Sequence, residues 1–304
     1  MIELGVQTRG DWEHLLAVAR WAEGRGLKAI ALPDHYLQRG DETTKPAWDH
    51  LVHLAALARE TELDLVSLVS PVTFRHPAVL YKMGVTIDEV SGGRFTLGLG
   101  AGWMKEEFEL FGLPFPETST RVEMLEEAMA YLRAAITPGP AGFTGKHYTL
   151  AEFDPAPRPA NLRLMAGGAG KARARRLTAL YADEYNLYAC PPERFRTIVE
   201  KTGQLADEAG RQPGDILWSS AGPALAARGQ ADYRRLLENL ASRTGQTTER
   251  IEQVYEERSY PHGSGAKASE MVTALAEAGC QRYYPQIMGQ DLADFDLIID
   301  AFQG

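Results

Sequence analysis

An acid and an imidazole stand side by side at Asp34 and His35, directly after the apolar segment 28–33. Such a pair can bind the polar edge of a ligand and bring a titratable group to a substrate, because histidine changes charge near neutral pH. The alternative is structural, with Asp34 capping a helix and His35 in a loop. His76, which precedes a proline at the start of a predicted helix, has a pattern more typical of a structural residue.

Two glycine-rich segments follow predicted strands. In residues 167–170, Gly-Gly-Ala-Gly, small residues before a helix let backbone N–H groups approach an anion, and the helix N-terminus adds the positive end of a dipole. This pattern predicts a phosphate site, with a tight turn as the alternative. Residues 98–102, Gly-Leu-Gly-Ala-Gly, resemble a dinucleotide-binding motif but follow the fourth strand rather than the first. They indicate either a planar ring or phosphate close to the backbone, or relief of crowding at a barrel rim.

The basic residues that follow the segment 167–170 are expected on a solvated helix surface. Contact with a charged tail of a ligand is the alternative. These basic residues are Lys171, Arg173, Arg175 and Arg176.

Other reaction classes lack their motifs. The chain has no Ser-His-Asp order, Walker motif or zinc-ligand spacing, so hydrolysis and phosphoryl transfer are disfavoured. Cys190 and Cys280 stand ninety positions apart, which predicts reduced, buried thiols and no metal site. A net charge of −9 argues against a nucleic-acid surface. The N-terminal residues lack a signal-peptide pattern and no window holds 18 apolar residues, so we expect a cytoplasmic protein that does not enter a membrane.

Eight apolar, strand-like segments alternate with helical patterns along the 304 residues. The segments are 2–7, 28–33, 63–69, a fourth that ends at Gly100, 162–166, 183–188, 215–220 and 281–287. Strands that are apolar on both faces must be covered on both faces, which favours a parallel sheet surrounded by helices. Eight such units predict an α/β fold of the (β/α)8 TIM-barrel type, with a doubly wound open sheet as the alternative. The active site is then expected at the carboxyl ends of the strands.

We expect one barrel domain over residues 1–304 with three insertions. A short helix and loop lie near 103–118, a β-hairpin turned at Gly145 lies within 138–160, and an extra helix followed by a loop at 259–265 lies within 246–265. The loops 37–48, 104–116 and 247–265 are expected to shape the substrate pocket.

At these motifs the sequence resembles the bacterial luciferase-like flavin and deazaflavin enzymes. The resemblance covers nearly the whole chain and is most specific over residues 63–136. The matching segments are Pro33-Asp34-His35, residues 70–78, residues 91–103, the hairpin at 143–148, and Ala166-Gly167-Gly168 followed by Tyr181-Ala182-Asp183.

The resemblance implies a (β/α)8 barrel that binds FMN or the 5-deazaflavin coenzyme F420 at the carboxyl ends of the strands. It implies a cis peptide at Ser67-Leu68, in a bulge against the ring, and Asp34-His35 at the ring and the substrate pocket, with His35 as the catalytic residue. Contacts to the cofactor phosphate are implied at Ala101, Gly102, Met165, Ala166, Gly167 and Gly168.

Two departures bear on the substrate. The family's glucose-6-phosphate dehydrogenases carry an acidic proton donor directly after the glycine that corresponds to Gly102, where this chain has Trp103. A tryptophan that follows their Asp-His pair is replaced by Leu37-Gln38-Arg39. Sugar-phosphate oxidation is therefore not expected, and the small organic substrate stays open.

Three functions follow from the resemblance. The leading hypothesis is an F420-dependent oxidoreductase that transfers a hydride to or from a small molecule, with His35 exchanging a proton. The alternatives are an FMN-dependent monooxygenase supplied with reduced flavin by a separate reductase, and a cofactor-binding protein without catalysis. The resemblance also implies a homodimer.

Overall fold

The computed structural model describes residues 2–37, 47–286 and 291–303. Gln38 and Arg39, most of the loop 37–48, and Ile287 at the end of the predicted eighth strand lie outside the described residues. No helix in the described ranges is long and apolar enough to cross a membrane.

Eight parallel strands close into a barrel in the spatial order β1-β12-β9-β8-β7-β4-β3-β2. The predicted (β/α)8 barrel is confirmed, and the open-sheet alternative is excluded because β1 pairs with both β2 and β12. The barrel strands are β1 (Glu3–Gln7), β2 (Ala29–Leu32), β3 (Asp64–Pro71), β4 (Phe95–Gly100), β7 (Arg163–Gly168), β8 (Glu184–Tyr188), β9 (Leu217–Pro223) and β12 (Arg282–Gln286).

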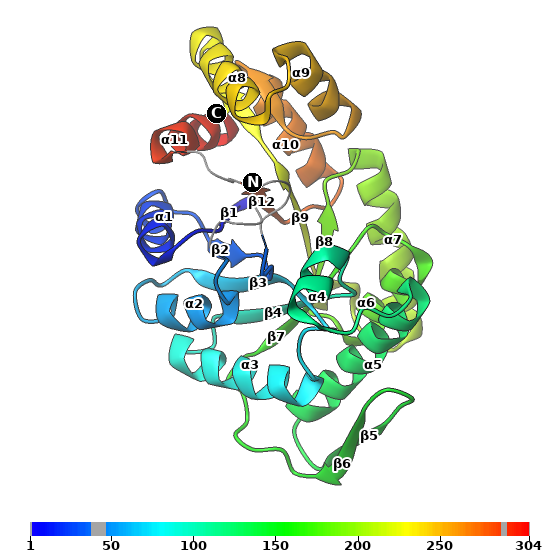
Figure 1. Ribbon diagram of the computed structural model, residues 1–304. Coiled ribbons are helices and arrows are strands. Elements are labelled where there is room, and N and C mark those ends of the chain that lie inside the picture. The colour runs from blue at the N-terminus through cyan, green and yellow to red at the C-terminus, as the bar shows by residue number, and fades with distance from the viewer. Residues whose placement is uncertain (1, 38–46, 287–290, 304) are drawn as a thin grey trace.

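Helices surround the barrel and cover the outward faces of its strands (Figure 1). They are α1 (Trp12–Gly24), α2 (His50–Leu57), α3 (Pro77–Ser91), α4 (Lys105–Phe111), α5 (Thr118–Ile136), α6 (Ala172–Tyr181), α7 (Pro192–Glu208), α8 (Gln230–Thr244), α9 (Thr248–Glu257), α10 (Lys267–Glu277) and α11 (Leu292–Gln303), with a 3₁₀ turn η2 at Pro213–Asp215.

Local sequence signals explain where the helices next to the site begin and end. Asp11 caps α1 by accepting a 3.0 Å hydrogen bond from the backbone N–H of His14. His76 caps α3 by accepting from the N–H of Ala78, and proline follows at the first helical position. The same helix ends at Gly92, whose φ of 67° suits glycine.

Two small sheets accompany the barrel. The predicted hairpin is present as β5 (Ala141–Thr144) and β6 (Thr149–Phe153), which project from one side of the molecule (Figure 1). The expectation of a loop over 259–265 was wrong in part, because His262–Ser264 forms β11 and pairs in parallel with β10 (Leu225–Ala227). This pairing joins segments far apart in sequence, and local patterns carry no signal for it.

Strand β3 carries an irregularity at the rim. Its pairing with β4 shifts between Ser67 and Ser70, and the peptide bond between Leu68 and Val69 is cis. The position expected from the family resemblance, Ser67-Leu68, was therefore wrong by one residue. The Leu68 carbonyl accepts a 3.0 Å hydrogen bond from Gln7 Nε2 on β1, which fixes the direction in which the bulge points.

The side chain of Val69 explains three glycines on the neighbouring strands. A Cβ at Gly98 would lie 2.9 Å from Val69 Cγ1, one at Gly100 would lie 2.8 Å from Cγ2, and one at Gly167 would lie 3.0 Å from Cγ1. Gly98 is restricted further, because its Cβ would also meet the Ser67 carbonyl oxygen at 2.1 Å. Of the two interpretations of residues 98–102, relief of crowding holds at Gly98 and Gly100, and the same valine also requires a small residue at Gly167.

We expect Gly100→Ala to destabilise the protein by about 1–3 kcal/mol, the usual cost of overpacking a core. In a Val69→Ala background the same substitution should cost much less, because only the valine side chain occupies the space. Urea unfolding of the four proteins in this double-mutant cycle measures the coupling. Gly98→Ala is the matched control: its cost should persist in the Val69→Ala background, since the Ser67 carbonyl remains in the way. Equal costs of Gly100→Ala in both backgrounds would contradict the packing described above.

Candidate active site

A cavity of about 750 Å³ opens at the carboxyl ends of the barrel strands. This is the end at which barrel enzymes bind their substrates, and the volume lies in the range for a cofactor or drug-sized ligand. The strand ends and the segments after them supply the lining, which consists of Gln7, Arg9, Pro33, His35, Leu68, Val69, Pro71, Gly100, Gly102, Trp103, Met104, Gly167, Gly168, Asn186, Tyr188, Ala221, Pro223, Arg258 and Gln286.

His35 is held at the edge of this cavity by Glu107. Its Nδ1 lies 3.1 Å from Glu107 Oε1, and Glu107 is fully buried. The other carboxylate oxygen, Oε2, accepts a 3.0 Å hydrogen bond from the backbone N–H of Tyr36. The ring of Trp103 meets the imidazole edge-on at 5.6 Å between centroids. A carboxylate on Nδ1 favours the tautomer that carries its proton there, which leaves Nε2 as the nitrogen available for proton exchange.

Asp34 does not line the cavity but lies beneath the rim in a buried ion-pair network. Its Oδ1 is 3.0 Å from His50 Nδ1 and its Oδ2 is 2.6 Å from Arg75 Nη1, while the other end of the guanidinium binds Asp49. Burial by itself would raise the pKa of Asp34, but the charges and hydrogen bonds of His50 and Arg75 outweigh it and lower the pKa to about 2. Asp34 is therefore a charged anchor below His35.

His50 connects that anchor to the bulge in β3. Its Nε2 lies 2.8 Å from Ser67 Oγ and 3.3 Å from Ser70 Oγ, and the two serine hydroxyls are 2.9 Å apart. Ser67 and Ser70 flank the irregular residues, and both are fully buried. One imidazole therefore fixes both ends of the bulge to the carboxylate that follows β2.

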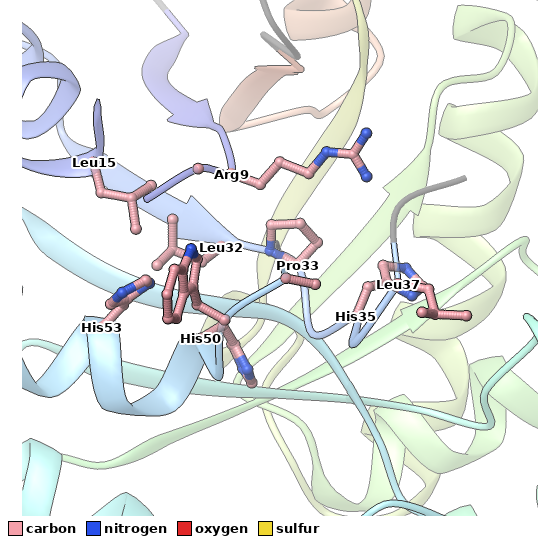
Figure 2. Close-up of a pocket in the computed structure, with 11 residues that line it drawn as sticks. Arg9, Leu15, Leu32, Pro33, His35, Leu37, His50 and His53 are labelled. Atoms are coloured by element: carbon pink, nitrogen blue, oxygen red, sulfur yellow. The ribbon is translucent and has the colours of Figure 1, made fainter. Parts of the chain in front are cut away.

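A second, small pocket of about 40 Å³ lies behind His35, with room for a water molecule or two (Figure 2). Arg9, Pro33 and His35 line both this pocket and the main cavity. In Figure 2, His53 lies on the opposite side of Pro33 from His35.

The structure brings together half of the site residues predicted from sequence. His35, Leu68, Gly102, Gly167 and Gly168 line the main cavity. The remaining five lie under or behind it: Asp34 and Ser67 in the network with His50, Met165 and Ala166 buried within β7, and Ala101 with its carbonyl accepting a 3.2 Å hydrogen bond from Arg121 Nε.

The turn between β7 and α6 retains features of an anion site. The first residues of α6 receive no side-chain cap, so their N–H groups are not satisfied by the chain itself at that end. Arg175 lies half-buried beside the turn with Nη1 donating to the Gly170 carbonyl, whereas Arg173 is exposed and pairs with Glu126. The expectation of a solvated surface therefore fits Lys171, Arg173 and Arg176, which are exposed, whereas Arg175 contacts the turn.

Sequence reasoning missed three residues that position this site. Glu107 contacts His35, which lies 72 positions earlier in the sequence. His50 contacts Ser67 across 17 positions, and Arg75 contacts Asp34 across 41. A signal existed for Glu107: on α4 it precedes the apolar Phe108, and both are buried. Glu107 lies four positions after Trp103 and contacts His35.

A sequence model of one family, described as luciferase-like monooxygenase, matches residues 2–284. The chain belongs to the luciferase-like monooxygenase family. The predicted family is thereby confirmed.

Curated relatives match over only part of their length. Pyrimidine monooxygenase RutA of Pseudomonas savastanoi pv. phaseolicola is 34% identical over 175 residues, which are 55% of this chain and 48% of the relative. The luciferase-like chain thus spans about half the length of the curated relatives it matches.

Solved structures with the same fold use either cofactor. An F420-dependent secondary alcohol dehydrogenase, in complex with an F420-acetone adduct, superimposes with a TM-score of 0.80 at 17% identity and covers 100% of this chain and 99% of its own. The oxygenating constituent of 3,6-diketocamphane monooxygenase from Pseudomonas putida, in complex with FMN, superimposes with a TM-score of 0.70 at 16% identity and covers 99% and 96%. At these identities the likeness shows the fold alone.

Asp34→Asn should lower the free energy of unfolding by about 3–5 kcal/mol at pH 7, because it leaves the buried Arg75 without its main counter-charge. The pKa of Asp34 is lowered in the folded state, from 3.8 to about 2, so its stabilisation is present above about pH 4 and is lost as the pH falls toward 2. Urea unfolding between pH 6 and pH 3 should therefore show a shallower acid dependence for Asp34→Asn than for the wild type. Asp49→Asn is the control, since that carboxylate is one-third exposed and should matter less. Parallel pH profiles for Asp34→Asn and the wild type would contradict this assignment.

Proposed function

We propose that this protein is an F420-dependent oxidoreductase that transfers a hydride to or from a small organic substrate. The observation that carries the proposal is the imidazole of His35, held by the buried Glu107 at the edge of the cavity. Hydride transfer to or from an alcohol requires a proton to leave or reach the substrate oxygen, and this imidazole is suited to exchange it.

The residues around the cavity fit a flat ring with a phosphate-bearing tail. The bulge at Leu68 and Val69 offers an apolar surface with room above it, and the cavity volume suits a tricyclic ring with a small substrate. The uncapped start of α6, with Gly167, Gly168 and Arg175 beside it, suits the phosphate. We therefore propose that Leu68, Gly102, Gly167 and Gly168 contact the cofactor, and that Asp34, Ser67, Ala101, Met165 and Ala166 support those contacts from below.

The bound deazaflavin would supply the hydride chemistry, and the chain would supply position and proton transfer. In the oxidising direction, Nε2 of His35 accepts the proton of a substrate hydroxyl as the C–H bond gives up its hydride. In the reducing direction, the imidazolium returns that proton to the oxygen. Glu107 holds the ring in place, because its buried carboxylate faces Nδ1.

We expect the purified protein to bind F420 more tightly than FMN. Titration of each cofactor, followed by its fluorescence or absorbance, gives the two dissociation constants directly. A tighter complex with FMN would overturn the choice of cofactor.

His35→Ala should retain cofactor affinity and lose about 100-fold or more in kcat, the usual scale for a residue that transfers a proton. Glu107→Gln keeps the shape and removes the charge, so its loss should be smaller. His76→Ala is the matched control: this histidine caps α3 outside the cavity and its removal should leave kcat unchanged. The measurement is F420 reduction with a panel of secondary alcohols. Unchanged turnover in His35→Ala would remove this residue from the mechanism.

The second candidate is a monooxygenase that uses reduced FMN from a separate reductase. The identity to pyrimidine monooxygenase RutA favours it. Oxygen consumption with reduced FMN and a pyrimidine such as uracil, above the rate without uracil, would support this candidate over the first.

A further inference from the structure

A chain of hydrogen bonds inside the barrel has a fixed polarity. Arg282 only donates, and its Nη1 lies 3.4 Å from the hydroxyl oxygen of Tyr284. Since Tyr284 accepts from Arg282, its own proton goes to Glu184 Oε1, at 3.2 Å. The same Oε1 accepts a 2.6 Å hydrogen bond from the Ser219 hydroxyl. Glu184 and Ser219 are both buried, so bulk water does not compete with these bonds.

This series of hydrogen bonds ends at Asn186 and determines which way the side-chain amide of Asn186 faces. The proton of Ser219 is committed to Glu184, so Ser219 Oγ is left as an acceptor and must receive a donor. That donor is Asn186 Nδ2, at 2.9 Å. Asn186 lines the main cavity on β8, beside Gly167 of β7. The opposite amide atom, Oδ1, therefore faces the cavity, and no described residue donates to it.

A second series of hydrogen bonds gives the same result on β1 and β12, and β12 is separated from β8 by β9 alone. The Leu68 carbonyl accepts from Gln7 Nε2, so Gln7 Oε1 is left as an acceptor. Gln286 Nε2 donates to that oxygen at 2.8 Å. Gln286 lines the cavity, and its own Oε1 is the polar atom that remains. Asn186 on β8 and Gln286 on β12 thus each present an amide oxygen to the cavity. The hydrogen bonds made by their Nδ2 and Nε2 atoms determine this orientation.

We propose that Asn186 Oδ1 is a specificity-determining acceptor, which selects ligands that bring an N–H or O–H group to the end of β8. A ligand that covers this oxygen without donating to it leaves a buried acceptor unpaired, and sites of this kind reject such analogues strongly. Ser219 is the positioning residue, because it prevents the amide from turning round. The inference rests on the proposed function, in which a ring and a substrate share this cavity.

Two groups can donate a hydrogen bond to Asn186 Oδ1, one on the cofactor ring and one on the substrate. Separate measurements distinguish them. The ring of a flavin or deazaflavin has an imide N–H, which is present in lumiflavin and replaced by a methyl group in 3-methyllumiflavin. The substrate alcohol has a hydroxyl group. Binding of the two ring probes is measured by fluorescence titration, and KM is measured for whichever alcohol supports turnover. The proteins compared are the wild type, Asn186→Leu, Ser219→Ala and Ser220→Ala.

Ser220→Ala is the matched control. Ser220 is the next residue on β9 and is equally buried, but its hydroxyl has no partner in the described part of the chain. It should therefore keep the ligand preference of the wild type, whereas Ser219→Ala should weaken that preference without abolishing folding.

If the ring meets Asn186, the wild type should prefer lumiflavin over its methylated derivative by about 10-fold or more, and Asn186→Leu should lose this preference. If the substrate meets it, the two ring probes should bind alike in all variants and KM should rise about 10-fold or more in Asn186→Leu. The proposal is overturned if Asn186→Leu changes neither the ring preference nor KM by more than about twofold, or if Ser219→Ala and Ser220→Ala behave alike. Failure of lumiflavin, FMN and F420 to bind at all would instead overturn the proposed function.

Discussion

The site depends on the insertion of one valine among three glycines. Val69 leaves the regular path of β3 and fills the space above Gly98, Gly100 and Gly167 on two neighbouring strands. A side chain at any of the three would displace it. With Val69 in this position, the Leu68 carbonyl points to Gln7 and the bulge becomes the floor of the cavity. Close packing here determines the shape that a ligand meets.

Buried polar groups then fix what surrounds that floor. The network of Asp34, Arg75 and His50 ties the end of β2 to the bulge, and Glu107 ties α4 to His35. Each charged group is paired, which a low-dielectric interior requires, and removing one partner leaves the other uncompensated. Glu107 therefore contacts the cavity-lining His35, while Asp34 supports the rim from below. This division explains how adjacent residues in sequence, Asp34 and His35, come to have different roles.

The barrel interior also connects its two ends. Arg282 binds Glu3 and Asp64 near the amino ends of their strands, and the hydrogen-bond chain through Tyr284, Glu184 and Ser219 runs from it toward the cavity. In a core filled only with aliphatic side chains, an amide at the cavity would be free to turn. Here the hydrogen bonds converge on Glu184 Oε1, which accepts from Tyr284 and from Ser219, and the Ser219 oxygen in turn accepts from Asn186.

By itself the sequence determined the eight strand-helix units, the barrel class, the two glycine-rich turns and the position of His35, because apolar periodicity and strand-end polarity are local properties of the chain. The family resemblance implied a cis peptide at Ser67-Leu68, one residue from its position at Leu68-Val69. Only the tertiary structure decided that Glu107 is the partner of His35, that Val69 accounts for the glycines, that β10 and β11 pair, and that Asn186 lines the cavity while its Nδ2 donates to Ser219. These features arise from contacts between segments far apart in sequence, and barrel closure brings them together in a way that no local pattern encodes.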